Sequence, residues 1–462
     1  MLKRILIANR GEIAVRIIRA CRELSVETIA VYTESDREEL HTMLADRAVC
    51  IGGDRPESGY LNMENIIEAA KLTSCDAIHP GFGFLSENPR FAEMCEENDI
   101  VFIGPHSSVI GLLGDKIRAR QIVSQAGVSI VPGSDGPLSG IEEAKQCARK
   151  IGYPVMIKAS AGGGGRGMRR AASEEELENA MMEAKTEAEV SFGNGTIYME
   201  KLITDPKHIE FQILADSFGN IIHLGDRNCC VQRRNQKMLE EAPDFRLSDE
   251  MRAKMGRDAV LAAKTAGYEN AGTVEFIVDG SNYYFIEMNT RLQVEHPVTE
   301  MITGTDIVKQ QIRIASGLRL NMTQQDIVIR GHSIECRVCA EDIYNDYAPD
   351  PSEINFLHLP SGLGVRVESA LYSGMRISPF YDSMILKVIT YGDTRLEAVR
   401  RMRRALGETI IRGCKTNLPV LQLILYNREF LRGDYNTGFM DKHGDHLLEL
   451  YDAAGGRLNE SV

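Results

Sequence analysis

Long hydrophobic runs are missing from this sequence. No segment of its 462 residues approaches the roughly 18 unbroken apolar residues that a membrane-spanning helix needs. The N-terminus, MLKRILIANRGE, also lacks the small-residue cleavage site of a secretory signal. We therefore expect a soluble protein of the cytoplasm that does not bind membranes.

Basic blocks and regularly spaced cysteines are missing as well. The net charge is -13, and no Lys/Arg block is present that would displace counterions from nucleic-acid phosphates. Cys336 and Cys339 form a CxxC pair without a second pair at the spacing of a zinc site. The composition excludes a general nucleic-acid binder, and it predicts that the ten cysteines are reduced thiols.

The first part of the chain alternates strand and helix patterns. Residues 3–8 predict a strand, 13–24 a helix and 28–32 a second strand. The series continues with strands at 48–51, 77–80 and 101–103 and helices at 62–72 and 89–97. This alternation is typical of an open parallel sheet with helices on both faces. The first turn reads NRGE and not GxGxxG, which argues against a nicotinamide dehydrogenase.

Two glycine turns follow strand ends. The run 161–168, AGGGGRGM, comes after a strand at 155–158 that ends at Lys158, and its unshielded amides can close around phosphate oxygens. It lacks the GK[ST] ending of a P-loop, and a flexible linker is the alternative. The turn 81–84, GFGF, precedes Ser86 and Glu87 at a helix start and is equally compatible with a structural role.

The segment 275–295, EFIVDGSNYYFIEMNTRLQVE, is the richest in chemistry. Glu275 and Glu287 stand on two strand-like segments joined by the turn 279–282, so both carboxylates can point to one face of a hairpin. Polar residues continue at a period of two, and the row predicts oxygen ligands for Mg²⁺ beside a fixed positive charge. A solvated hairpin with a charged outer face is the alternative. The row consists of Asn289, Arg291, Gln293 and Glu295.

A set of ordered motifs resembles biotin carboxylase, an ATP-grasp ligase, from Met1 to about His446. The motifs are HPGFGFLSENPRFA, KASAGGGGRGM, EKLI, HIEFQI, VQRRNQK, EFI and EMNTRLQVEHPVTE. The resemblance implies an α/β protein with an N-terminal open parallel sheet domain at 1–114. It further implies an ATP-grasp domain at 115–330 with a glycine-rich lid at about 130–203, a C-terminal α+β domain at 331–446 and a tail at 447–462.

The reaction that the resemblance implies joins ATP, bicarbonate and biotin to give ADP, phosphate and N-carboxybiotin. It is the first half-reaction of acetyl-CoA carboxylase, which feeds malonyl-CoA and fatty acid synthesis, or of a related carboxylase. Mg²⁺ or Mn²⁺ would accompany ATP. No Met-Lys-Met tetrapeptide of the AMKM kind occurs, so we expect biotin on a separate carboxyl carrier protein, with a carboxyltransferase as a further partner.

Residue roles follow from the resemblance alone. Lys237, Arg291 and Glu295 would be catalytic, with Glu295 taking the bicarbonate proton and Arg291 stabilising the ureido oxygen of biotin. Glu275, Glu287 and Asn289 would hold the metal. The bicarbonate and biotin pocket would comprise Lys237, Arg291, Gln293, Val294, Glu295 and Arg337. The nucleotide would contact Lys116, Lys158, Gly164, Gly165, Glu200, Lys201, Leu202, Ile203, His208, Gln232 and Asn235.

Two further expectations concern assembly and one departure from the family pattern. Arg16, Arg19 and Glu23 fall on one face of the first helix and resemble the dimer surface of the family, the alternative being an ordinary charged face. Asn235 stands where the family usually has histidine in VQRRHQK, which predicts a weakened nucleotide contact. The rival functions are another ATP-grasp carboxylate ligase and a non-catalytic scaffold relative, for which Asn235 is the only hint.

Overall fold

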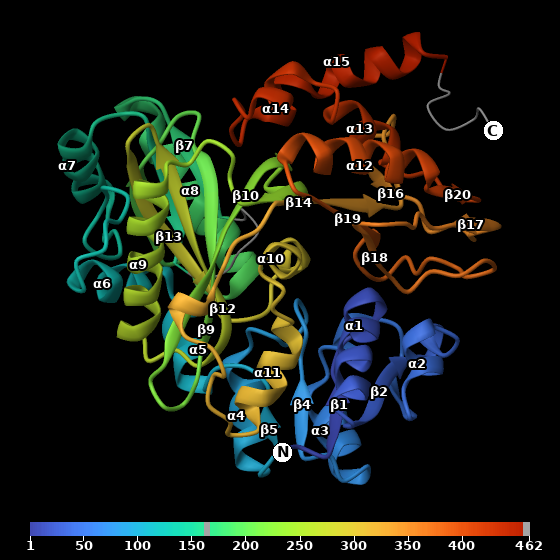
Figure 1. Cartoon of the computed structure of the whole chain (residues 1–462). Helices are drawn as coiled ribbons and strands as arrows, with labels where there is room; N and C mark the ends of the chain where they lie inside the picture. The colour runs from blue at the N-terminus through green and yellow to red at the C-terminus, as the bar shows by residue number, and fades with distance from the viewer. Residues whose placement is uncertain (161–166, 456–462) are drawn as a thin grey trace.

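The N-terminal part forms a five-stranded parallel sheet. The computed structural model describes residues 1–160 and 167–455, and in it the strand order is β3-β2-β1-β4-β5 with helices on both faces (Figure 1). Ile5 and Ile7 of β1 pack on one face of this sheet and Leu6 and Ala8 on the other. The predicted parallel sheet is therefore confirmed. Its elements are β1 (Arg4–Ile7), α1 (Gly11–Glu23), β2 (Glu27–Thr33), α2 (Leu40–Leu44), β3 (Arg47–Gly52), α3 (Met63–Leu72), β4 (Ala77–His79), α4 (Pro89–Glu97), β5 (Val101–Phe102) and α5 (Ser107–Gly114).

A small subdomain with a core of its own follows α6 (Lys116–Gln125) and lies at the left of Figure 1. Its sheet has the order β7-β6-β8 and is covered by two helices. Asp115 caps α6 and accepts the N–H groups of Ile117 and Arg118. The predicted lid residues Gly164 and Gly165 lie outside the described residues. The subdomain comprises α7 (Ile141–Ile151), β6 (Val155–Ala159), β7 (Met168–Ala171), α8 (Glu174–Phe192) and β8 (Ile197–Lys201).

An eight-stranded antiparallel sheet forms the centre of the molecule, with the order β13-β12-β9-β10-β11-β14-β19-β18. The sheet crosses the predicted boundary between the ATP-grasp domain (115–330) and the C-terminal domain (331–446), because β11 pairs with β14. Its strands are β9 (Lys207–Ala215), β10 (Ile221–Arg233), β11 (Gln236–Ala242), β12 (Asn270–Asp279), β13 (Asn282–Asn289), β14 (His332–Cys339), β18 (Val365–Ser369) and β19 (Met384–Gly392).

Helices cover this sheet. α9 packs on β9, β10 and β12, whereas α10 lies on β10, β11, β14 and β19, and α12 covers the C-terminal end (Figure 1). No helix within the described ranges is both long enough and apolar enough to cross a membrane. The remaining elements are α9 (Asp249–Thr265), α10 (His296–Thr303), α11 (Ile307–Ala315), β15 (Glu341–Asp342), β16 (Ala348–Pro349), β17 (Phe356–His358), α12 (Arg395–Glu408), β20 (Ile410–Arg412), α13 (Leu418–Ile424), α14 (Arg428–Arg432) and α15 (Phe439–Ala453).

The hairpin of β12 and β13 places the two acids that the sequence singled out. Glu275 and Glu287 are directly opposed, so their side chains leave the sheet on the same face, as predicted. The register shifts by one residue beside this pair, and the bulge lets Phe285 pair with Phe276 in the core. The expected continuation of the row as a strand is wrong. β13 ends at Asn289, and the chain then turns so that Glu295 becomes the residue before α10.

Candidate active site

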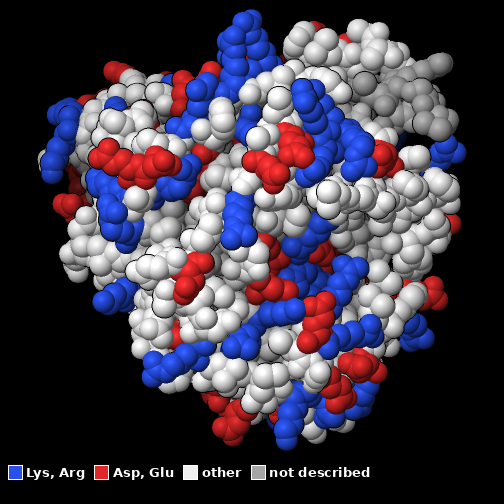
Figure 2. Space-filling view, in the orientation of Figure 1, with Lys and Arg blue, Asp and Glu red and all other residues white. Residues whose placement is uncertain are grey.

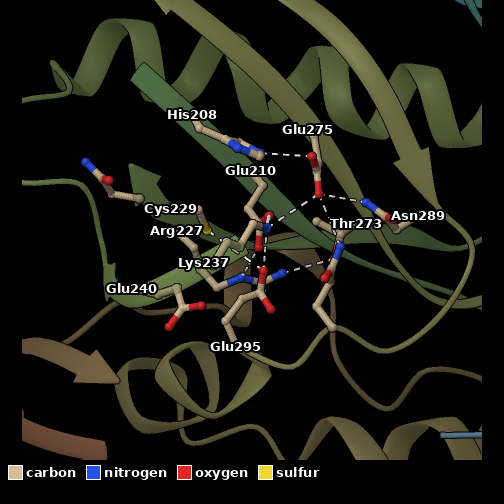
Figure 3. A network of polar contacts seen from close by, with 12 residues as sticks. His208, Glu210, Arg227, Cys229, Lys237, Glu240, Thr273, Glu275, Asn289 and Glu295 are labelled. Atoms are coloured by element: carbon tan, nitrogen blue, oxygen red, sulfur yellow. Dashed lines mark hydrogen bonds and ion pairs between the residues drawn. The ribbon is translucent and has the colours of Figure 1, made fainter. Parts of the chain in front are cut away.

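Glu275 lies at the centre of a cluster of polar side chains. His208 Nε2 lies 2.8 Å from one carboxylate oxygen, while Asn289 Nδ2 donates to the other at 2.7 Å (Figure 3). Gln293 donates to the same oxygen at 3.2 Å, and Lys237 Nζ lies 3.5 Å away. Burial would raise the pKa of Glu275, but Lys237 and His208 outweigh burial and hold it well below its usual range. The acid is therefore ionised at neutral pH.

The lysines predicted to hold phosphates are paired with carboxylates. Lys116 Nζ lies 2.9 Å from Glu287, and Lys158 forms a close ion pair with Glu200. Arg120 binds the same Glu200 carboxylate. Burial opposes ionisation of Glu200, but Lys158 and Arg120 lower its pKa. Lys116 also contributes to the lowered pKa of Glu200, so the two ion pairs are neighbours.

The other residues of the predicted nucleotide segment, Lys201 to Ile203, follow Glu200 at the end of β8. The Lys201 ammonium donates to the carbonyls of Gly152 and Tyr153 at 2.9 Å each, so this side chain fastens the end of β8 to the turn between α7 and β6. Leu202 and Ile203 are half-buried beyond it.

Glu295 is a fully buried carboxylate between two cations. One oxygen lies 2.5 Å from Lys237 Nζ, and the other accepts a hydrogen bond from Arg337 at 2.9 Å. Burial alone would raise the pKa of Glu295, but Lys237, Arg337 and Arg227 together hold it well below its usual range. A proton acceptor is therefore present in its charged form.

Arg291 lies beside this acid, in the turn after β13. Its guanidinium donates to Glu87 at 2.8 Å, to Gln293 Oε1 at 3.2 Å and to Asn289 Oδ1 at 3.3 Å. The backbone carbonyl of Val294 accepts the ammonium of Lys387 at 2.8 Å. Glu87 was noticed in the sequence only as a residue at a helix start. Its contact with Arg291 crosses more than two hundred residues and has no local signal.

Two further members of the cluster were missed. Glu210 accepts Lys237 at 2.7 Å and Arg227 at 2.6 Å, and the exposed fractions of Glu210 and Arg227 are both 0% (Figure 3). A signal for Glu210 exists, because His208 and Glu210 are two residues apart in HIEFQI and therefore share a face of β9. Arg227 has no comparable signal in the sequence.

The hairpin that carries Lys237 explains Asn235. Gln232 and Lys237 are opposed across β10 and β11, and Arg234 and Asn235 form the exposed two-residue tip. The φ angles of Arg234 and Asn235 are 49° and 63°, in the left-handed region where asparagine is favoured. The residue therefore suits the turn whatever its contact with a nucleotide.

Two carboxylates and an imidazole lie close enough together to hold a cation, because ligand atoms of His208, Glu210 and Glu275 lie within 4.8 Å of one another. Of the predicted metal residues, Glu275 belongs to this group, whereas Glu287 leaves the same face of the hairpin and is paired with Lys116. Carboxylate and amide oxygens are the ligands that Mg²⁺ prefers. A second cluster contains Cys229, but burial raises the pKa of this thiol well above its usual range, so no thiolate is available there.

Comparison with known proteins gives one consistent result. Residues 1–110 match the family "Biotin carboxylase, N-terminal domain", 115–323 match "Carbamoyl-phosphate synthase L chain, ATP binding domain", and 335–442 match "Biotin carboxylase C-terminal domain". Biotin carboxylase 1 of Bacillus subtilis is 54% identical over 98% of this chain and 100% of its own length. Biotin carboxylase of Haemophilus influenzae is 52% identical over 96% of this chain and 99% of its own length.

A solved structure gives the same answer. The biotin carboxylase domain of Hydrogenobacter thermophilus 2-oxoglutarate carboxylase, a dimer with MgADP, ADP and bicarbonate, superposes with a TM-score of 0.94. It is 52% identical and covers 97% of this chain and 98% of its own. That relative thus binds an adenine nucleotide, Mg²⁺ and bicarbonate, the ligand classes predicted from the sequence. The chain belongs to the biotin carboxylase family of ATP-grasp ligases, and its activity is the ATP-dependent carboxylation of biotin by bicarbonate.

Proposed function

We propose that the clustered residues divide the reaction among three neighbouring groups. Lys116 and Lys158 neutralise the nucleotide phosphates, since their ammonium groups are held in neighbouring ion pairs by Glu287 and Glu200. Glu275, Glu287 and Asn289 would hold Mg²⁺, which would offset the negative charge of the phosphates. His208, Gln232 and the segment 200–203 complete the nucleotide side, with Asn235 at its exposed edge.

The bicarbonate pocket forms the second group, and Glu295 is its base. An oxygen of bicarbonate attacks the γ-phosphorus of ATP, the bond between that phosphorus and ADP breaks, and Glu295 takes the bicarbonate proton. The products of this step are carboxyphosphate and ADP. The observation that carries the assignment is the carboxylate of Glu295, which is fully buried and fixed on both sides by Lys237 and Arg337. Gln293 and Val294 complete the pocket.

The third group serves biotin. Carboxyphosphate separates into CO₂ and phosphate, and either that phosphate or Glu295 takes the proton from the ureido nitrogen, which then attacks CO₂. Arg291 offsets the negative charge that develops on the ureido oxygen, and Arg337 contacts bicarbonate or biotin.

Release of ADP in a screen of acceptors tests this assignment against another ATP-grasp ligase. We expect release to require bicarbonate and to rise when free biotin is added. Other small carboxylates should not replace bicarbonate, because the pocket offers two cations around one buried base. Release with a different carboxylate in place of bicarbonate would favour the rival ligase, and no release under any condition would favour the scaffold relative.

A homodimer is the second proposal. Arg16, Arg19 and Glu23 line a hollow of about 320 Å³ with residues of β18, in a region of mixed charge (Figure 2). Arg16 is only 6% exposed and forms ion pairs with Glu300 and Asp306, so it is a buried, fixed part of the wall of the hollow. Arg19 is 50% exposed. The Hydrogenobacter relative is described as a dimer.

Light scattering of Arg19→Glu tests the dimer. Reversal of this charge beside Glu368 should shift the wild-type dimer toward monomer. The matched control is Arg404→Glu on α12, an exposed arginine paired with Glu408, which should leave the mass unchanged. A wild-type protein that is monomeric at micromolar concentration contradicts the proposal.

The remaining partners are a separate carrier protein that bears biotin and a carboxyltransferase that selects the final acceptor. Relatives at 52% identity are named for pyruvate and 2-oxoglutarate carboxylases, so the choice among these and acetyl-CoA lies outside this chain. Pull-down from the native cells followed by identification of the bound polypeptides tests this. Covalent biotin on this chain in an avidin blot would contradict the carrier proposal.

The cysteines among the described residues are free, which supports a cytoplasmic location.

A further inference from the structure

Two buried acids that the mechanism does not use lie behind Arg337. Glu240 of β11 and Glu335 of β14 are directly opposed in the sheet, and both are 0% exposed. Opposed residues of an antiparallel pair project from the same face, so these carboxyls are neighbours. Arg337, two residues after Glu335 on β14, shares this face.

The cations near the pair contact one of its four carboxyl oxygens among the described residues. Arg337 donates to Glu240 Oε1 at 2.6 Å and to Glu295 at 2.9 Å. Lys387, opposite Arg337 on β19, donates to the carbonyl of Val294 and pairs with Glu12 at 3.0 Å. Neither oxygen of Glu335 has a hydrogen-bond partner among the described residues, and Glu240 Oε2 has none either. An ionised carboxylate buried without partners is costly, and a proton removes that cost.

The charge balance around the pair points the same way. Glu335 faces Lys387, Glu240, Arg337 and Glu295, and Glu240 faces Arg337, Glu295 and Lys237. Burial raises the pKa of Glu335 well above its usual range despite Lys387. Burial likewise raises the pKa of Glu240 to about 7 despite Arg337.

We infer that Glu335 is a neutral carboxylic acid that donates its proton to Glu240 Oε2, so that the pair holds one proton and acts on Glu295 through Arg337. This arrangement satisfies the unpartnered oxygen of Glu240 and leaves one negative charge on the pair. That charge shares the Arg337 guanidinium with Glu295. Glu240 and Glu335 are therefore positioning residues, because Glu240 binds Arg337, Glu335 acts through Glu240, and neither is placed against the substrate.

The consequence concerns the strength of the base. If Glu240 lost its charge, Arg337 would pair with Glu295 alone, which would lower the pKa of Glu295 and weaken it as a proton acceptor. A charged Glu240 keeps Arg337 from stabilising the Glu295 carboxylate in full. This part of the inference rests on the proposed role of Glu295 as the base for bicarbonate, whereas the position of the proton does not.

Neutron diffraction of deuterated wild-type protein at neutral pH locates the proton directly. We expect a deuteron between Glu335 and Glu240 Oε2, and two bare carboxylates would overturn the inference. Infrared spectroscopy of variants gives a second measurement. The carbonyl band of a protonated carboxyl should disappear in Glu335→Gln. It should remain in the control Glu241→Gln, since Glu241, the next residue on β11, is paired with Arg395 and His332.

The split between kcat/KM for bicarbonate and KM for ATP, measured at a pH of about 8, tests the coupling to Glu295. In Glu240→Gln we expect kcat/KM for bicarbonate to fall by about tenfold, the equivalent of one pKa unit, while KM for ATP stays within about twofold. In Glu335→Gln, which keeps a neutral hydrogen-bond donor, kcat/KM for bicarbonate should fall by no more than about threefold, the loss expected from a weakened neutral hydrogen bond. An unchanged kcat/KM for bicarbonate in Glu240→Gln overturns the coupling. Combined with the expected deuteron, that result would fault the role of Glu295 and not the shared proton.

Discussion

Arg291 Nε lies 2.8 Å from Glu87 Oε2, so a residue of the N-terminal sheet domain holds the arginine of the proposed biotin pocket. The other oxygen of Glu87 accepts the backbone N–H of Thr290 at 3.1 Å. Glu87 thus fixes both the side chain of Arg291 and the turn that presents it. The site depends in this way on contacts between segments that are far apart in the sequence.

Replacement of Arg291 by alanine should separate biotin chemistry from nucleotide binding. We expect the Kd of ATP to stay within about threefold, a change of less than 1 kcal/mol. The reason is that Arg291 contacts Glu87 and Gln293, and not the two lysines that are proposed to hold the phosphates. Biotin carboxylation should fall by roughly a hundredfold or more, the usual effect of removing one charge-stabilising group. Calorimetry with ATP and steady-state kinetics measure the two quantities. A collapse of ATP affinity would show that the residue belongs to the nucleotide side.

Glu295→Gln should remove the base while keeping the shape of the site. Because glutamine cannot take the bicarbonate proton, kcat should fall by about 10²–10⁴. The matched control is Glu408→Gln on α12, an exposed acid paired with Arg404, which should leave kcat unchanged. Steady-state rates of ADP formation at saturating ATP provide the measurement. Turnover of Glu295→Gln at the wild-type rate would exclude Glu295 as the base.

Asn235→His should give a modest gain and no more. The loss of one neutral contact is worth about 0.5–1.5 kcal/mol, so we expect KM for ATP to fall by up to roughly tenfold and kcat to change only a few-fold. Histidine also tolerates the left-handed conformation that Asn235 adopts. Kinetics of free-biotin carboxylation at saturating Mg²⁺ compare the two proteins. An inactive wild type together with an active histidine variant would favour the scaffold relative.

Glu241 should contribute to stability in a pH-dependent way. Burial opposes ionisation, but Arg395 and His332 hold the pKa of Glu241 well below its usual range. Its contribution is therefore complete above the unfolded pKa of about 4.3 and is lost as pH falls toward the folded value. Glu241→Gln, which leaves Arg395 buried without its partner, should cost about 3–5 kcal/mol at neutral pH.

Urea unfolding of wild type and Glu241→Gln over a range of pH measures this contribution. The difference between the two midpoints should narrow below about pH 4.3, where glutamate in the unfolded chain binds protons. Arg404→Ala, which breaks an exposed pair with Glu408, is the control and should cost no more than about 1 kcal/mol at any pH. An equal loss of unfolding free energy in Glu241→Gln and Arg404→Ala would contradict the prediction, because the buried pair would then stabilise the protein no more than the exposed pair.

Local sequence patterns predicted the helices and strands that depend only on neighbouring residues of the chain. The alternating apolar segments from β1 to β5 gave the parallel sheet, and the period of two gave the opposed pair Glu275 and Glu287. The same period failed after Asn289, because a strand pattern cannot show where the chain leaves the sheet to begin α10. The motifs still predicted Glu295 as a site residue, and in the structure a turn, not a strand, places it in the cluster.

Contacts between distant strands could not be predicted in this way. Arg227, Glu240 and Glu335 are charged residues in the middle of buried strands, where sequence patterns predict apolar side chains. Their burial makes sense only when β9, β10, β11 and β14 are side by side, since each charge is then next to a partner or a shared proton. Pairing across a sheet is decided by tertiary structure, and one sequence contains no record of it.

The transfer of labelled bicarbonate to free biotin tests the central claim most directly. Wild-type protein with ATP, Mg²⁺, biotin and ¹⁴C-bicarbonate should produce acid-labile label on biotin, in step with ADP, and omission of ATP should abolish it. Glu295→Gln in the same assay should form neither product at an appreciable rate. Release of ADP by the wild type with no label on biotin would contradict the account.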